Sequence, residues 1–205
     1  MSERGRFDGV TIAFHWLIVA LFVPLLASVF LLGSSLRLDA ATLIDIHRGT
    51  GAAILALTLL RLIWRKTVAR LPPFPATMSR LHRLAVTGSE GVLYALLFAQ
   101  PLSGLAMTVA RGRAFTLLFW QVPALMTRDK GLAALCHGVH ETIAYALLAL
   151  IGIHATAALL HHFVLRDDVL SAMLPLARPR QHCTAATTAP PRAPSQAPAK
   201  LATSR

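Results

Sequence analysis

Nine histidines occur in a chain that is 55% hydrophobic and only 14% charged. Four of them lie within or at the ends of long apolar stretches: His15, His47, His140 and His154. A neutral imidazole can ligate a metal or move a proton, and an ionisable group inside an apolar stretch marks a functional site by default. A lone histidine there is more often a hydrogen-bonding partner between helices. The spacing of the four therefore decides between the two interpretations.

The most informative spacing separates His140 from His154. Fourteen residues at about 100° per residue end about 40° short of four whole helical turns, so both imidazoles face the same side of a helix. At about 1.5 Å per residue, the two histidines are about 21 Å apart along that helix. This spacing predicts two sites at two depths rather than one shared site.

The elements that position these histidines are four apolar stretches, at residues 10–32, 47–64, 85–110 and 135–165. Each is close to the roughly 20 residues that span a bilayer as a helix. Strand-like alternation does not compete with this pattern, and no internal repeat is visible. Because lipid tolerates only helices and closed barrels, the sequence predicts an all-α membrane protein with a four-helix transmembrane bundle over residues 10–175.

The net charge of +11 arises from 20 Lys and Arg against 9 Asp and Glu. The basic residues lie between the apolar stretches and in the tail, which fits lipid headgroups rather than nucleic acid. The side with both chain ends carries 14 Lys and Arg, and the other side carries 6. The positive-inside rule therefore predicts that both termini are cytoplasmic. Residues 1–9 form a cytoplasmic N-terminus, and the Ala- and Pro-rich residues 176–205 form a disordered cytoplasmic tail.

This topology predicts which histidines meet. His47 and His140 lie near the outer face, and His15 and His154 lie near the cytoplasmic face. Two bis-histidine sites inside four apolar helices match the needs of two haem groups. No carboxylate or thiolate is placed to complete another kind of metal site, and the two cysteines form no C-x-x-C motif. His137, one turn before His140, is the alternative outer ligand.

Several motifs occur in a specific order along residues 6–175: IAFHWL, IHRGTG, RLIWR, LYALLFAQPLSG, FTLLFWQVPAL and HETIAYALLALIGIHATAALLHH. With this ordered set, the chain resembles the prokaryotic cytochrome b561 family of four-helix dihaem membrane proteins. The resemblance implies two non-covalent haem b groups ligated by His15, His47, His140 and His154. It also implies a multi-pass protein of the bacterial inner membrane. The pattern H-E-T at His140 favours that residue over His137.

Further residues are candidates for contact with haem or quinone. The resemblance implies that ubiquinone approaches the inner haem, where His161 could bond a quinone carbonyl or carry its proton. Arg61 and Arg48 could bind haem propionates, or else serve as membrane-surface anchors. Gly49, next to a ligand, would let a porphyrin approach the backbone. Glu90 could influence the inner haem or pair with Arg83 on its own helix.

The resulting hypothesis is transmembrane electron transfer with superoxide oxidised outside and ubiquinone reduced inside, as one activity in the family implies. The outer basic residues could steer a small anion: Arg37, Arg48, Arg111, Arg113, Arg128 and Lys130. The alternative is a cytochrome b anchor subunit that passes electrons between a partner dehydrogenase or hydrogenase and quinone. A third hypothesis is a four-helix membrane protein without haem, such as a small transporter.

Overall fold

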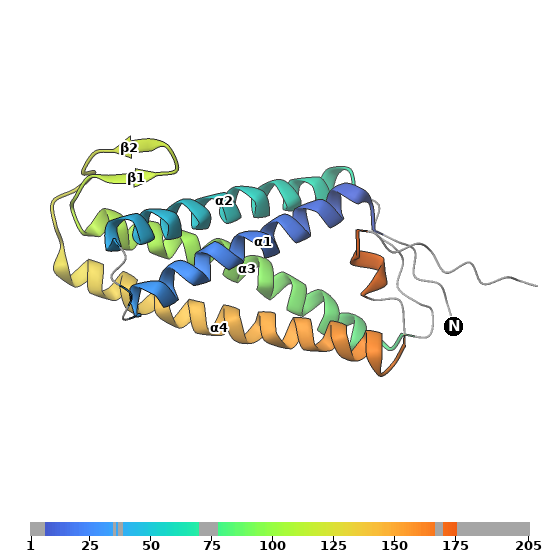
Figure 1. Cartoon of the computed structure of the whole chain (residues 1–205). Coiled ribbons are helices and arrows are strands. Elements are labelled where there is room, and N and C mark those ends of the chain that lie inside the picture. The colour runs from blue at the N-terminus through green and yellow to red at the C-terminus, as the bar shows by residue number, and fades with distance from the viewer. Residues whose placement is uncertain (1–6, 35, 37–38, 70–77, 167–169, 176–205) are drawn as a thin grey trace, which may run out of the picture.

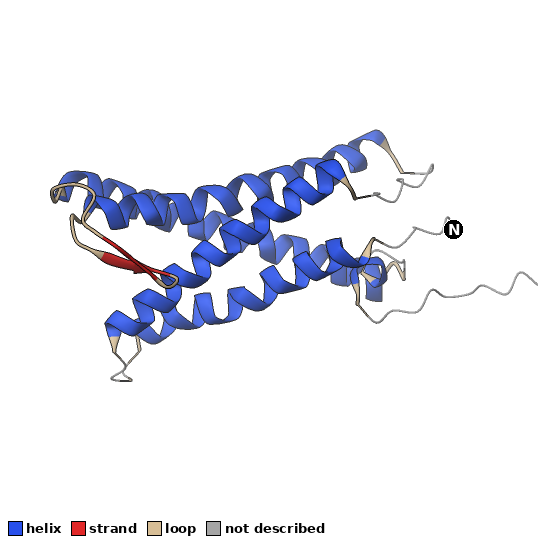
Figure 2. Ribbon diagram, turned by 90° about the horizontal axis from the view of Figure 1, so that it is seen from above, coloured by secondary structure: helices blue, strands red, loops and turns tan. Residues whose placement is uncertain are grey.

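The structure, a computed structural model, describes residues 7–34, 36, 39–69, 78–166 and 170–175. Four long helices dominate this part of the chain: α1 (Gly9–Leu32), α2 (Ala40–Thr67), α3 (Arg80–Ala110) and α4 (Lys130–Phe163). All four are long and apolar enough to cross a membrane. Figures 1 and 2 show them side by side as an elongated bundle. The prediction of four membrane-spanning helices is thereby confirmed.

The helices extend beyond the apolar stretches because polar residues cap their first turns. α2 begins at Ala40, α3 at Arg80 and α4 at Lys130, each several residues before the apolar stretch. Each helix follows a side chain that accepts a backbone N–H of its first turn, which offsets the unpaired donors there. These caps are Asp8, Asp39, Ser79 and Asp129.

Two of these caps have carboxyl groups with a lowered pKa. The hydroxyl of Thr42 and the backbone N–H groups of Thr42 and Ala41 lower the pKa of Asp39. For Asp8, burial raises the pKa, but hydrogen bonds from Thr11 and Trp64 outweigh it and the pKa falls. The hydrogen bonds to Asp39 and Asp8 favour the ionised carboxylate, which the helix N-terminus also stabilises.

The bundle has two ends, and we name them by what they carry. The terminal end holds the start of α1, the end of α2, the start of α3 and the end of α4; the hairpin end lies opposite. Helix α1 packs along α2, and α3 packs along α4, whereas α2 and α3 have a smaller contact. The bundle thus consists of two helix pairs, α1 with α2 and α3 with α4. A site between the pairs takes its side chains from both.

Few side chains in the described part are buried. The buried apolar residues are Ile12, Ile18, Leu43, Ile54, Ala110, Phe115, Leu147 and Ala172. Leu147 is the buried residue of the 34-residue helix α4. Most other apolar side chains face outward, as expected of helices whose solvent is lipid.

A β-hairpin lies beside the start of α2 (Figure 1) and was not predicted. Strand β1 (Phe115–Leu117) pairs antiparallel with β2 (Trp120–Val122), with Phe115 opposite Val122. Three-residue strands are too short to show alternation in the sequence. The turn also lacks the Gly or Asn that marks most tight hairpins. Leu118 stands in the turn with a φ of 55°, a value that leucine rarely takes.

At the terminal end, a short 3₁₀ helix, η1 (Ser171–Met173), returns to α1. The indole N–H of Trp16 donates to the Met173 carbonyl at 2.8 Å, and that of Trp64 donates to Asp8 at 3.0 Å. The predicted tail at 176–205 and most of the predicted N-terminal segment lie outside the described residues.

Candidate functional site

The four predicted histidines come together as two pairs, each joining one helix pair to the other. His47 of α2 faces His140 of α4 with ring centroids 6.2 Å apart at the hairpin end. His15 of α1 faces His154 of α4 with ring centroids 6.5 Å apart toward the terminal end. The structure thus brings these residues together in the pairs and at the two depths that the spacing on α4 predicts.

The backbone of α1 orients His47. Its Nδ1 atom lies 3.3 Å from the Leu25 carbonyl oxygen and 3.3 Å from Oγ of the buried Ser28. Ser28 Oγ itself donates to the same carbonyl at 2.6 Å. Since a carbonyl only accepts, Nδ1 must carry the proton, which leaves a lone pair on Nε2. This is the arrangement in which an imidazole ligates a metal through Nε2.

Helix α3 orients His140 in the same way. Its Nδ1 atom lies 3.0 Å from the Gln100 carbonyl oxygen and 3.0 Å from Ser103 Oγ. Ser103 Oγ donates to that carbonyl at 2.8 Å. The ring lies so close to α3 that a Cβ atom on Gly104 would be 2.9 Å from its Cε1 atom. Gly104 therefore makes room for the imidazole.

One contact at His140 would change if its Nε2 ligated a metal. The Gln100 side-chain nitrogen lies 3.1 Å from Nε2, and Oε1 of the same amide is buried without a hydrogen-bond partner in the described part. The amide would have to turn away for Nε2 to bind a metal. An unsatisfied buried amide oxygen makes the present rotamer costly.

The pair at His15 and His154 has a different, cationic environment. Arg61 Nη1 lies 3.5 Å from His15 Nδ1, and the Arg61 guanidinium lies 5.6 Å from the Tyr94 ring centroid. The Tyr94 hydroxyl is buried without a hydrogen-bond partner in the described residues. Because a guanidinium only donates, this contact opposes the tautomer with a lone pair on Nε2. Ligation by His15 therefore requires Arg61 to turn toward an anion.

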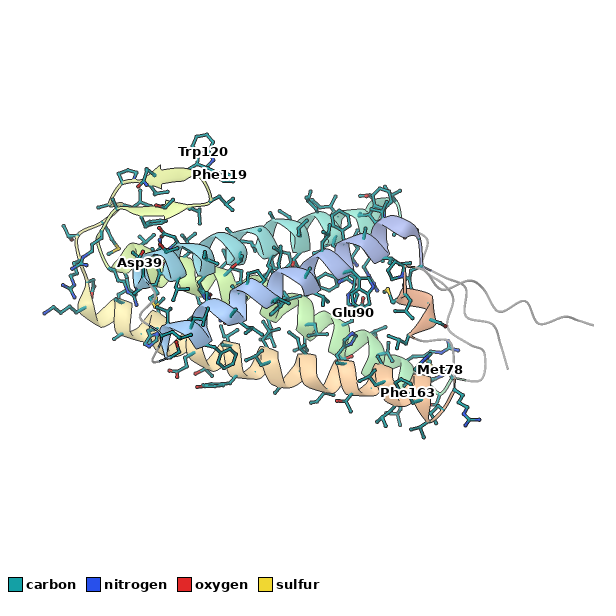
Figure 3. The ribbon with its side chains drawn as sticks, in the orientation of Figure 1. Asp39, Met78, Glu90, Phe119, Trp120 and Phe163 are labelled. Carbon is teal, nitrogen blue, oxygen red and sulfur yellow. The ribbon has the colours of Figure 1, made fainter. Side chains whose placement is uncertain are left out.

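Glu90 and Arg65 form an ion pair that joins α3 to α2. Their two hydrogen bonds are 2.5 and 2.7 Å, and both side chains are mostly buried. Glu90 lies in the half of the bundle nearer the terminal end (Figure 3). The partner of Glu90 is thus on α2, and the predicted alternative of a pair with Arg83 is wrong.

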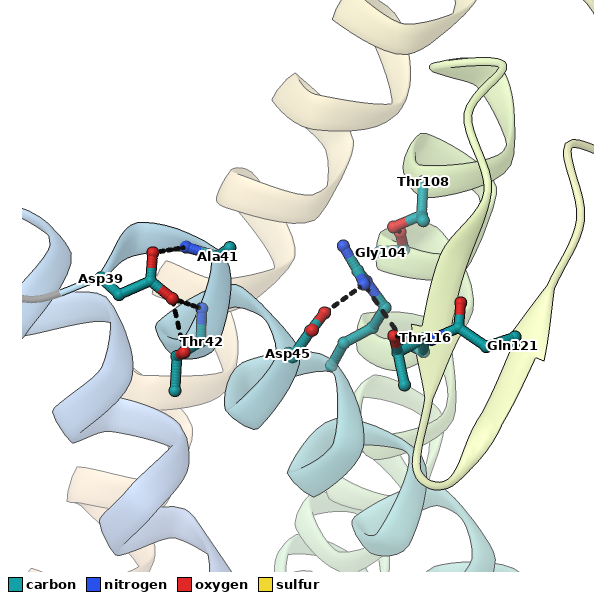
Figure 4. Close-up of polar contacts among 9 residues, drawn as sticks. Asp39, Ala41, Thr42, Asp45, Gly104, Thr108, Thr116 and Gln121 are labelled. Atoms are coloured by element: carbon teal, nitrogen blue, oxygen red, sulfur yellow. Dashed lines mark hydrogen bonds and ion pairs between the residues drawn. The ribbon is translucent and has the colours of Figure 1, made fainter.

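Arg48 and Gly49, two further candidates, contact the hairpin. Arg48 Nη1 donates to Asp45 at 2.8 Å and to the Thr116 carbonyl at 3.2 Å (Figure 4), and its guanidinium lies 5.5 Å from the Phe115 ring centroid. A Cβ atom on Gly49 would meet Leu118 of the turn at 3.9 Å. In this structure Arg48 ties the hairpin to α2, with Gly49 beside its turn, which the sequence did not predict.

Four further histidines of the described part lie near the ends of α3 and α4: His82, His137, His161 and His162. His161, in the last turn of α4, has its ring centroid 6.0 Å from that of His82. His82 belongs to the first turn of α3, and its side chain is exposed. His137 is also exposed, and it is not part of either histidine pair.

The two pairs fit a group that needs two protein ligands on opposite sides. A metal about 2 Å from each ring nitrogen lies about 3 Å from each ring centroid, so two opposed imidazoles are about 6 Å apart. Both measured separations are close to this value. No cluster of three or more His, Cys, Asp or Glu side chains among the described residues could hold a bare metal ion. The donor sets therefore suit haem, whose porphyrin supplies the other four ligands.

Comparison with known proteins agrees with this chemistry. The family model for prokaryotic cytochrome b561 matches residues 6–176. A protein of Yersinia pestis named "Probable superoxide oxidase CybB" is 31% identical, covering 84% of this chain and 98% of its own length. Two Escherichia coli proteins, cytochrome b561 homologs 2 and 1, are 29% and 30% identical. The matches cover 82% and 83% of this chain and 91% and 98% of the relatives.

Proposed function

The chain belongs to the prokaryotic cytochrome b561 family, and from this premise we propose that it passes electrons from superoxide to ubiquinone across the bacterial inner membrane. Transmembrane electron transfer and a multi-pass position in that membrane follow from the family and the four apolar helices. The superoxide donor, the quinone acceptor and the number of haems are our proposal. The observation that carries it is the two opposed histidine pairs at two depths.

Two b haems are the proposed cofactors, ligated by His47 with His140 and by His15 with His154. Haem iron supplies one-electron redox chemistry, which the protein side chains themselves lack. The residues of this chain set its position and access. The carbonyls of Leu25 and Gln100 hold the Nδ1 protons, which leaves the lone pair for ligation on both Nε2 atoms. Arg61 is the nearest cation to His15, and we assign it to a haem propionate.

The hairpin end is proposed to face the periplasm, with both termini in the cytoplasm. This orientation rests on the excess of Lys and Arg at the terminal end. The cations at the hairpin end attract small anions over a long range, which raises the rate at which superoxide arrives. Arg37 lies outside the described residues, and Arg48 is paired with Asp45. Arg111, Arg113, Arg128 and Lys130 therefore carry most of this attraction.

The terminal end is the proposed site of quinone reduction. Two superoxide anions each lose one electron and become oxygen, and one ubiquinone takes two electrons and two protons to become ubiquinol. The protons come from the cytoplasmic side, where His161 and His82 lie together. An imidazole can give up a proton and regain it from water. His161 is the proposed quinone-side residue.

A visible spectrum of the purified protein tests the proposal. We expect a b-type reduced-minus-oxidised spectrum with two haems per chain, and reduction of both by superoxide. His154→Ala should leave one haem per chain, whereas His137→Ala, a histidine outside both pairs, should keep two. Two haems in H154A would overturn the ligand assignment. Reduction by a partner dehydrogenase or hydrogenase but not by superoxide would overturn the donor and favour an anchor subunit.

A further inference from the structure

The hairpin end contains a pocket of about 260 Å³ that neither histidine pair uses. Its lining residues are Arg111, Arg113 and Arg128. The first two follow the end of α3, and the third precedes α4, so the pocket lies where these two helices meet. Three guanidinium groups around one pocket offer up to fifteen N–H donors and no acceptor, a set that suits an oxyanion.

The backbone around this pocket is fixed. Gly112 adopts a φ of 64°, and a Cβ atom there would lie 2.4 Å from the backbone nitrogen of Arg128. The Asp129 N–H donates to the Ala110 carbonyl at 3.0 Å. Only glycine tolerates this close approach at position 112. The two ends of the segment between α3 and α4 are therefore held together. The three arginines project from this fixed backbone.

The pocket carries uncompensated charge. No carboxylate in the described part lies within ion-pair distance of the three arginines. The nearest acid in sequence, Asp129, accepts the Leu132 N–H at 2.9 Å as the cap of α4. Arg48, at the same end of the bundle, differs because Asp45 neutralises it. Repulsion among three guanidinium groups favours a bound anion between them.

The depth of the pocket points to the lipid headgroups. Arg111 follows directly after the last residue of the membrane-spanning helix α3. Its Nη2 atom lies 3.6 Å from Sδ of Met107, one turn back along that helix. The guanidinium thus folds back along the end of this membrane-spanning helix, which is the level expected for lipid phosphates.

From this arrangement we infer that the pocket formed by Arg111, Arg113 and Arg128 binds a phosphate group. A phospholipid headgroup and free inorganic phosphate both offer this chemistry, and the depth of Arg111 favours the headgroup. The site does not depend on the proposed orientation, since both leaflets contain phosphate. The three arginines also belong to the cations that attract superoxide in the proposed function, but the test below measures phosphate binding alone, so its failure would leave the proposed function untouched.

Thermal unfolding of the full chain with its haem, in detergent, tests the inference. Ligand binding to the folded state raises the unfolding midpoint. We expect dioctanoyl-phosphatidylglycerol to raise the midpoint, and dioctanoylglycerol, which lacks phosphate, to leave it unchanged. A matching rise with inorganic phosphate alone would identify free phosphate as the source. A rise that requires the phospholipid would identify the headgroup. No rise with either phosphate-containing probe would overturn the inference.

Matched variants separate this site from net charge. Arg113→Gln and Lys130→Gln each remove one exposed cation at the hairpin end, but only the first changes the pocket. Arg113→Gln should weaken phosphatidylglycerol binding about tenfold, the usual cost of a charge-assisted hydrogen bond. Arg128→Gln should do the same from the segment before α4, and Lys130→Gln should have little effect. Equal weakening in R113Q and K130Q would overturn a specific site, and so would unchanged binding in both pocket variants.

Discussion

At the scale of residues, the two histidines at the hairpin end are held by the same short pattern. In α1 the carbonyl of Leu25 and the hydroxyl of Ser28, three residues later, meet Nδ1 of His47. In α3 the carbonyl of Gln100 and the hydroxyl of Ser103 meet Nδ1 of His140. Each helix pair therefore presents an imidazole with a fixed tautomer before any cofactor binds. Preorganised ligands of this kind bind more tightly because less entropy is lost on binding.

The glycine under His140 provides a direct test of this fixed position. In Gly104→Ala the new methyl group would approach Cε1 of His140 to 2.9 Å, so the ring must move. We expect loss of most of the haem ligated by His140, to about one haem per chain, measured by absorbance per chain. Alanine is otherwise favoured over glycine in a helix by about 0.5–1 kcal/mol. Gly88→Ala, with nothing within 4 Å of its Cβ position, should keep both haems.

Arg61, which lies beside the pair His15 and His154, predicts that the two histidine pairs hold haems of different redox potential. Arg61 lies within hydrogen-bond distance of His15, whereas the groups at that distance from His47 and His140 are neutral serine, glutamine and backbone groups. Arg48, the cation next to His47, is neutralised by Asp45. A nearby cation stabilises the more negative, reduced state of an iron centre. Arg61→Gln should therefore lower the midpoint potential at His15 and His154, by about 50–100 mV for a unit charge at an effective dielectric near 20.

A redox titration followed by visible absorbance checks this shift. Lys66→Gln, an exposed cation at the end of the same helix, is the control and should leave both potentials close to their original values. A higher potential at His15 and His154 would make transfer toward the terminal end downhill, which is the proposed direction. A lower potential at the hairpin-end pair in R61Q would contradict the placement of Arg61.

At the scale of elements, the Glu90–Arg65 ion pair joins the two helix pairs through α2 and α3, whose contact is otherwise small. Glu90→Ala leaves Arg65 mostly buried without its partner, which is the costly way to break such a pair. We expect a loss of about 2–3 kcal/mol of stability, measured by thermal or denaturant unfolding in detergent. The double variant R65A/E90A should be less destabilised than the sum of the two single variants. Strict additivity would show that the pair does not link these helices.

The sequence predicted those elements that have a strong periodic or compositional signal. Four apolar stretches located the membrane-spanning helices, and the phase of His140 and His154 on one helix selected the residues that pair. The helix starts were placed five to seven residues late for α2, α3 and α4, because polar capping turns carry no apolar signal. Contacts between distant segments also have no local signature. This explains why the partner of Glu90 and the hairpin role of Arg48 were not found.

The whole molecule consists of two helix pairs with few buried side chains between them, and only Leu147 of α4 belongs to the described core. In lipid or detergent, apolar surface alone gives these pairs little reason to associate. We therefore expect the group that the histidines ligate between the two helix pairs to supply much of the bundle's stability. Binding linkage then predicts that haem removal lowers stability by about 4 kcal/mol or more for a tightly held cofactor.

Protein made in cells starved of haem precursor tests this expectation. The helix content measured by far-ultraviolet circular dichroism should stay nearly constant, since backbone hydrogen bonds within each helix persist in detergent. The unfolding midpoint should fall well below that of the holoprotein, and hydrogen exchange should rise most where His15 faces His154 and His47 faces His140. H47A/H140A, which keeps one pair, should unfold at an intermediate temperature. An apoprotein as stable as the holoprotein would show instead that the Arg65–Glu90 pair and the packed side chains suffice to hold the two helix pairs together.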